Sequence, residues 1–250
     1  MERYEIGLLT TLLLGIFIVI GAFIALLINK KSKIIEFSIG LAFGVIVGII
    51  ITDLLPEIFE NLGFRYIYIA IIGIVAGFVI LKLLDNFIPD HHEHKMSNSE
   101  AKENLVHIGV MTSVALILHN IIEGMAVYSS CLSNASLGLA LTIGIGFHNI
   151  PLGMVIASSF YHSTKNIKKT VFTIFLVSLS TFLGGFIMYL LNLESISSYI
   201  LGGLLSLTLG MLIFIVIDEL LPKISEIKNK KISIAGILLG FILIILAMFI

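Results

Sequence analysis

Eight apolar runs, each long enough to cross a lipid bilayer as a helix, limit the possible folds of this chain more than any other feature. A transmembrane helix needs about 20 predominantly apolar residues. Only 12% of the residues are charged, against about 25% in an ordinary soluble domain, and the mean hydropathy is +1.11. The sequence therefore predicts an all-α integral membrane protein, with helices near residues 6–28, 37–58, 65–88, 105–130, 136–161, 168–192, 197–221 and 232–250.

The first run is interpreted as a retained helix and not as a signal peptide, because the segment before it, MERYE, is not basic. The loops are short, so we expect a single transmembrane domain over residues 1–250. The only sizeable loop covers residues 89–104 and contains the tract His91, His92, Glu93 and His94. Such tracts bind metal ions weakly, which we favour here; the alternative is a plain solvated loop.

Positive charge is distributed unevenly over the two sides of the predicted bundle. Arg3 and Arg65 belong to one side, and all thirteen lysines belong to the other. Cytoplasmic loops of membrane proteins carry the excess of Lys and Arg. The odd-numbered loops, including the His-containing loop, are therefore predicted to be cytoplasmic, and both termini to lie outside. The lysines are Lys30, Lys31, Lys33, Lys82, Lys95, Lys102, Lys165, Lys168, Lys169, Lys223, Lys228, Lys230 and Lys231.

Two predicted helices share a polar motif. Residues 119–127 read HNIIEGMAV and residues 148–156 read HNIPLGMVI, so His, Asn, Ile, Gly and Met recur at the same offsets. His119 and Glu123 are four residues apart and share a helix face. Ionisable groups inside a bilayer are costly and usually functional, and imidazole with carboxylate suits zinc, iron, manganese or cobalt. We favour a metal site completed by His148; the alternative is two packed helices with buried polar contacts.

Two further residues bear on that site. The single cysteine, Cys131, excludes an intramolecular disulfide and a Cys-based zinc cluster. Pro151 has no N–H, so the carbonyl of Phe147 loses its helical partner. That carbonyl faces either an ion or a water-filled cavity, or it marks a simple kink.

Carboxylates recur in two similar strings near the ends of the second and seventh runs. Asp53 stands in TDLLPE, and Asp218 and Glu219 stand in IDELLPK. The two runs cross the membrane in opposite directions, so the same signature falls on opposite faces, as an inverted repeat produces. Runs one to three would then mirror runs six to eight, with four and five as the central pair. The alternative is that acids near helix ends reach out to water.

The chain resembles the Zrt/Irt-like (ZIP) family of divalent metal transporters, in its bacterial form. The resemblance covers nearly the whole chain and includes the DLLPE and DELLP strings. Its most specific motifs stand here as His119, Asn120, Glu123 and Gly124, and as His148, Asn149, Pro151 and Gly153. The resemblance implies a 3+2+3 helical bundle, a metal site between helices four and five, and uptake toward the cytoplasm. It also implies zinc as the most frequent cargo, with iron, manganese or cadmium as other candidates.

Two departures from the family pattern bear on how many ions the site holds. Bacterial members usually carry Glu where this chain has Leu152, and often carry another Glu where it has Thr181. Those carboxylates complete a two-metal centre, so this chain is predicted to hold one ion. Its ligands are expected to be His119, Glu123 and His148, with Asn120, Asn149 or water completing the shell. The resemblance also implies that Asp53 attracts ions on the outer side, while Asp218 and Glu219 receive them on the inner side.

The predicted function is transport of a divalent transition-metal ion, zinc above all, across the cell membrane by alternating access. The alternative is a membrane metal-binding or sensor protein that does not transport. The sequence contains no HExxH, G-x-S-x-G or P-loop motif, so enzyme activity is not expected. The expected partners are the metal ion and the lipid bilayer, not nucleic acid, and a homodimer is compatible with the sequence.

Overall fold

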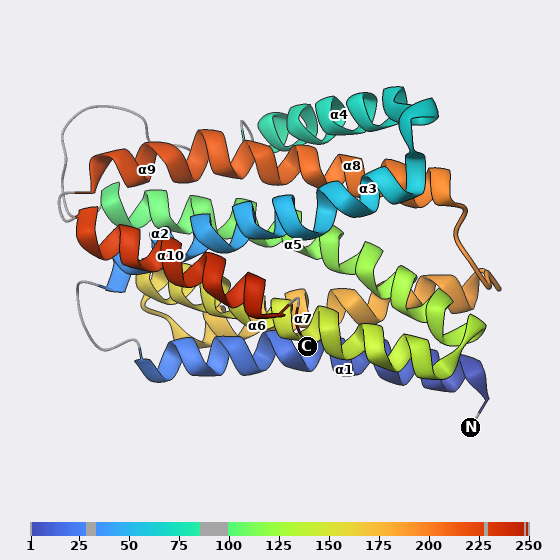
Figure 1. The fold of residues 1–250 in the computed structure, drawn as a ribbon. Coiled ribbons are helices and arrows are strands. Elements are labelled where there is room, and N and C mark those ends of the chain that lie inside the picture. The colour runs from blue at the N-terminus through green and yellow to red at the C-terminus, as the bar shows by residue number, and fades with distance from the viewer. Residues whose placement is uncertain (1, 29–33, 86–99, 228–229, 248, 250) are drawn as a thin grey trace.

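The computed structural model describes residues 2–28, 34–85, 100–227, 230–247 and 249, and these form a bundle of long helices (Figure 1). The tract His91–His94 and most of the 89–104 loop lie outside the described residues. The elements are α1 (Arg3–Ile28), α2 (Ile34–Ile49), η1 (Ile50–Leu54), α3 (Leu55–Leu62), η2 (Phe64–Tyr66), α4 (Ile67–Asp85), α5 (Glu100–Ser133), α6 (Ala135–Thr164), α7 (Ile167–Leu190), α8 (Ser198–Phe214), η3 (Ile215–Leu220), α9 (Leu221–Glu226) and α10 (Lys230–Ala247).

Membrane-length apolar helices account for most of this bundle. Within the described residues, seven stretches are long and apolar enough to cross a membrane, and no strand occurs. The seven correspond to the first seven predicted runs, and the eighth run forms α10, an 18-residue helix outside that set. The all-helical membrane class is confirmed, and the count of eight crossings stays a prediction. Figure 1 shows α10 running toward the end of the bundle at which α1 begins.

The helices pack as two groups. In the first group α1 lies along α6 and α5 lies along α7, and all four contact one another through α5–α6, α1–α7 and α1–α5. In the second group α2 lies along α10 and α4 lies along α8. Fewer residues join the groups, chiefly through α2–α6 and α5–α8. The helices that carry the two HN motifs thus belong to one group, and the carboxylate strings belong to the other.

Each carboxylate string overlaps a π-helical turn that ends two residues before a proline. Pro56 has no N–H, and its ring crowds the preceding turn, so the normal helical hydrogen bond to the carbonyl four residues earlier is lost. The N–H of Leu55 instead donates to the carbonyl of Ile50, five residues back. The residue before Pro222 makes the same five-residue bond in η3. The two strings therefore share one local structure, a form that often marks functional sites.

Candidate metal centre

Helix α5 contributes a histidine and a glutamate on one buried face. His119 and Glu123 lie one helical turn apart, and their Nε2 and Oε1 atoms are 2.9 Å apart. Their exposed fractions are 1% and 7%, so this polar pair is held away from both water and lipid. Neither ring nitrogen of His119 has a hydrogen-bond partner in the described structure. This imidazole can therefore still bind a metal ion.

Helix α6 brings its own motif against the same carboxylate. The Nε2 atom of His148 lies 2.8 Å from Oε1 of Glu123, and the Asn149 amide donates to Oε2 at 3.2 Å. One Glu123 oxygen therefore faces both imidazoles, while the other is held by an amide. This arrangement holds the carboxylate in one orientation, so that Oε1 and the two imidazoles meet at one point.

A second carboxylate reaches this point from the other packing group. Asp53 lies in η1, and it can offer one oxygen that, with the ligand atoms of His119, Glu123 and His148, forms a set within 4.8 Å of one another. Zinc binds nitrogen and oxygen ligands at about 2 Å, usually as a tetrahedron, so a small contraction of this set would surround an ion. Two imidazoles and two carboxylates are a suitable ligand set for zinc. Asp53, expected on the outer side, thus lies in the cluster itself.

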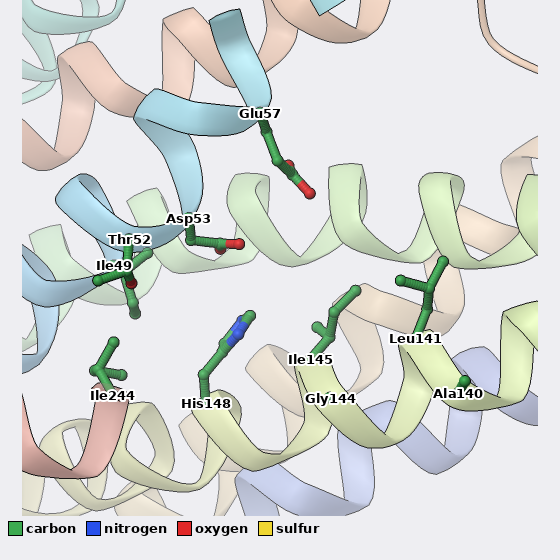
Figure 2. Close-up of a pocket in the computed structure, with 10 residues that line it drawn as sticks. All are labelled: Ile49, Thr52, Asp53, Glu57, Ala140, Leu141, Gly144, Ile145, His148 and Ile244. Carbon is green, nitrogen blue, oxygen red and sulfur yellow. The ribbon is translucent and has the colours of Figure 1, made fainter. Parts of the chain in front are cut away.

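A cavity of about 250 Å³ leads to the cluster from one side. Figure 2 shows Asp53 and His148 pointing toward each other across it, with Glu57 farther along on α3. Glu57 is a cavity residue that the sequence reasoning did not single out. Its signal was available, because it is four residues after Asp53 and a helix places such residues on one face. The rest of the wall comes from the first half of α6, including Leu141 and Gly144, together with Ile49, Thr52 and Ile244 of the second group.

Two asparagines beside the cluster keep unpartnered oxygens. Asn120 and Asn149 are fully buried, and in the described structure neither side-chain carbonyl accepts a hydrogen bond. The Asn120 amide instead donates to the backbone carbonyl of Val177 on α7 at 3.1 Å. A buried polar atom without a partner costs free energy, and a cation or its bound water would remove that cost here. The amide oxygens therefore suit the edge of a cation site.

The remaining predicted residues lie elsewhere. Asp218 is exposed and Glu219 half-buried on η3, and neither belongs to the cluster. Leu152 is buried, and the Thr181 hydroxyl donates to the carbonyl of Thr11 at 2.9 Å, which ties α7 to α1. Helix α6 continues through Pro151. Among the described residues, no second group of three metal-ligand side chains was found.

The fold and this cluster define a class: a multi-pass helical membrane protein with a buried set of metal-ligand side chains. The family described as "ZIP Zinc transporter" matches residues 89–248 of the chain. The chain belongs to this family of zinc transporters, which confirms the resemblance that the HN motifs indicated.

Curated relatives of this chain match it over nearly its whole length. The zinc transporter ZupT of Chlorobium limicola is 30% identical over 254 residues, covering 96% of each chain. ZupT of Clostridium perfringens is 30% identical over 269 residues, covering 97% of this chain and 94% of that one. ZupT of Stenotrophomonas maltophilia is 29% identical over 254 residues, covering 96% and 93%.

Proposed function

We propose that this chain carries zinc into the cytoplasm by alternating access, through a single-metal site between α5 and α6. The observation that carries the proposal is the buried cluster of two histidines and two carboxylates at the end of a cavity. Fixed negative charge at membrane depth needs a cation, and ionisable groups in such places mark ion pathways. The family and its relatives, which are named zinc transporters, support zinc as that cation.

Glycine contacts support the inverted repeat that alternating access requires. In each long helix pair of the two groups, a glycine lies so close to a partner backbone carbonyl that any Cβ would collide with it, and the contact is reciprocal. Small residues permit this approach in membranes. The contacts are Gly21–Ile150 with Gly153–Ile18, Gly184–Ile121 with Gly124–Thr181, Gly44–Ile237 with Gly240–Leu41, and Gly210–Ile74 with Gly77–Leu207.

These contacts relate the two halves of the chain residue by residue. The difference in residue number between Ile18 of α1 and Thr181 of α7 is the same as that between Gly21 and Gly184. Other constant differences in residue number relate α5 to α6, α2 to α8 and α4 to α10. Equivalent residues then make equivalent contacts throughout. A repeat of three helices on each side of a central pair accounts for this correspondence, and it implies eight crossings with both termini on one side.

The two central helices differ in what they expose, and this supports an outward-open state. On α6, Ala140, Leu141, Gly144 and Ile145 line the cavity. The matching positions on α5, Met111, Thr112, Ala115 and Leu116, are all buried. The open positions lie in the half of α6 remote from Lys165, which belongs to the predicted cytoplasmic side. The open cavity therefore faces outside, and the inner route is closed by a packed copy of the same surface.

The residues at the two departures from the family pattern, Leu152 and Thr181, favour a single bound ion. Leu152 has no ligand atom, and the Thr181 hydroxyl is hydrogen-bonded to α1. The carboxylates in reach are those of Asp53 and Glu123, whose two charges match one divalent cation. We propose His119, Glu123, His148 and Asp53 as ligands, with Asn120 and Asn149 at the edge. Asp218 and Glu219 are proposed to meet the ion on the inner side.

Zinc influx into liposomes containing the purified protein tests this function. The wild type should fill a trapped zinc-sensitive dye, whereas His119→Ala and Glu123→Ala should lose at least about tenfold of the initial rate, since each removes a ligand. Ser129→Ala is the matched control, because Ser129 is on the same helix but bonds only its own backbone at Met125. Zinc binding without any influx by the wild type would favour the alternative of a non-transporting metal-binding or sensor protein.

A further inference from the structure

Asp53 differs from the other three cluster residues in where its backbone belongs. His119, Glu123 and His148 stand on α5 and α6, within the group that α1 and α7 complete. Asp53 stands on η1, which continues α2 and packs with the second group. An ion held by all four residues would therefore bridge the two groups. If one group moves relative to the other, Asp53 is the ligand that separates from the ion.

Glu219 is the counterpart of Asp53 in the second half of the chain. Both acids stand three residues before the proline that ends a π-helical turn, Pro56 in one case and Pro222 in the other. Both turns continue helices that the reciprocal glycine contacts place in register. Glu219 lies outside the present cluster and is half-buried on the side where the surface of α5 is sealed.

The equivalence also pairs each acid with one histidine. Asp53 and His148 face each other across the open cavity. The shift that relates α6 to α5 takes His148 to His119, and the shift that relates α2 to α8 takes Asp53 to Glu219. If the inner side opens in the same way as the outer side is open here, the equivalence predicts that Glu219 will face His119. The loss of a carboxylate at position 152 makes this important, because Glu123 alone would leave a divalent ion with net positive charge in a low-dielectric site.

We propose that the ion exchanges one carboxylate for another as it crosses: Asp53 is its fourth ligand in the outward-open state, and Glu219 replaces Asp53 in the inward-open state. This inference rests on the proposed transport function and adds the residues that change. The three ligands on α5 and α6 stay bound throughout. The ion is neutralised in each end state by Glu123 together with an acid from the second group.

Two bulky substitutions separate the end states for measurement. A Cβ at Gly144 would meet no atom within 4 Å, so Gly144→Phe fits the open cavity and prevents its closure. Its counterpart Ala115 is fully buried, so Ala115→Phe overfills the closed inner side and favours the state in which that side is open. Each protein is purified whole, checked for monodispersity, and titrated with Zn²⁺ by calorimetry at moderate salt.

In the Gly144→Phe background, Asp53→Asn should weaken zinc affinity by at least about tenfold, and Glu219→Gln should leave it unchanged. Glu60→Gln is the matched control. It removes an exposed carboxylate of α3 that belongs neither to the cluster nor to the cavity wall, and should change affinity by less than roughly twofold. In the Ala115→Phe background the two results should exchange. X-ray absorption should show one oxygen ligand fewer in each weakened variant.

The outcomes separate this inference from the function on which it rests. Equal losses from Asp53→Asn and Glu219→Gln in the Gly144→Phe background, or no loss from Asp53→Asn, would overturn the exchange while leaving the site intact. Zinc affinity that survives His119→Ala in the same background would overturn the site itself. The Gly144→Phe arm decides the role of Asp53 even where Ala115→Phe does not fold.

Discussion

Helices α5 and α6 carry the same motif in opposite surroundings. Ala140, Leu141, Gly144 and Ile145 of α6 border an open cavity, whereas the four matching residues of α5 are sealed in the core. Their sequences do not explain this, since both sets are mostly apolar and both precede a histidine by the same distances. The second group packs differently against the two helices: α2 and α10 contact α6, whereas mainly α8 contacts α5. One surface therefore lines a cavity in one helix and is packed in the core in the other.

The largest expected effect comes from preventing the cavity beside α6 from closing. Gly144→Phe should abolish zinc influx, because the open side can no longer close, while zinc binding to the purified protein remains. Gly144→Ala is the control and should transport, since a methyl group has free space there. Liposome influx and calorimetry check the two halves of the prediction. Normal transport by Gly144→Phe would mean that the α6 surface never packs as the α5 surface does.

The next largest effect tests whether α5 and α6 contact their partner helices in equivalent ways. Gly124→Leu and Gly153→Leu each place a side chain against a backbone carbonyl of the partner helix, Thr181 in one case and Ile18 in the other. Overpacking of this kind costs about 1–3 kcal/mol or more. Both variants should lower the thermal midpoint of the purified protein by similar amounts. A large loss from one and none from the other would break the equivalence of the two helices.

A smaller effect concerns a carboxylate that the first HN motif has, at Glu123, and that the second HN motif lacks, at Leu152. Asn149 of α6 donates to Glu123 of α5, and the equivalent Asn120 would find its matching acceptor at position 152. Leu152→Glu together with Thr181→Glu should therefore raise the zinc stoichiometry from one toward two. The double change should be better tolerated than the sum of the single changes, because each added acid alone is buried without a partner. Elemental analysis of both proteins gives the answer, and two tightly bound ions in the wild type would contradict the single-metal site.

The smallest expected effect concerns the His91–His94 tract, which lies outside the described residues. Replacing its three histidines by Ser should alter the apparent zinc affinity of uptake only modestly, because weak metal binding on the cytoplasmic side concentrates ions without forming the main site. Concentration-dependent influx measures this. Complete loss of transport by a well-folded variant would show that the tract belongs to the obligatory pathway.

Much of this architecture could be predicted from the sequence, and the limits have a physical origin. The helices follow from apolar run length, and the His119–Glu123 face follows from a four-residue spacing within one helix. The position of Asp53 could not be predicted in the same way. Its approach to His148 depends on how a π-helical turn in one packing group meets α6 in the other, and local sequence does not determine such long-range contacts. The hydrogen bond by which the Thr181 hydroxyl joins α7 to α1 could not be predicted for the same reason.

Thiol accessibility at the two matched positions tests the central claim most directly. Cys131 is the only cysteine and is buried, so Gly144→Cys and Ala115→Cys can be made in a Cys131→Ala background. A membrane-impermeant thiol reagent is then applied from either side of oriented vesicles. If the two surfaces open in turn, the thiol at 144 reacts only from outside and the thiol at 115 only from inside. A bulky residue at either position then lowers labelling at the other. Labelling of both thiols from the same side, or none at 115 while zinc is being transported, would contradict it.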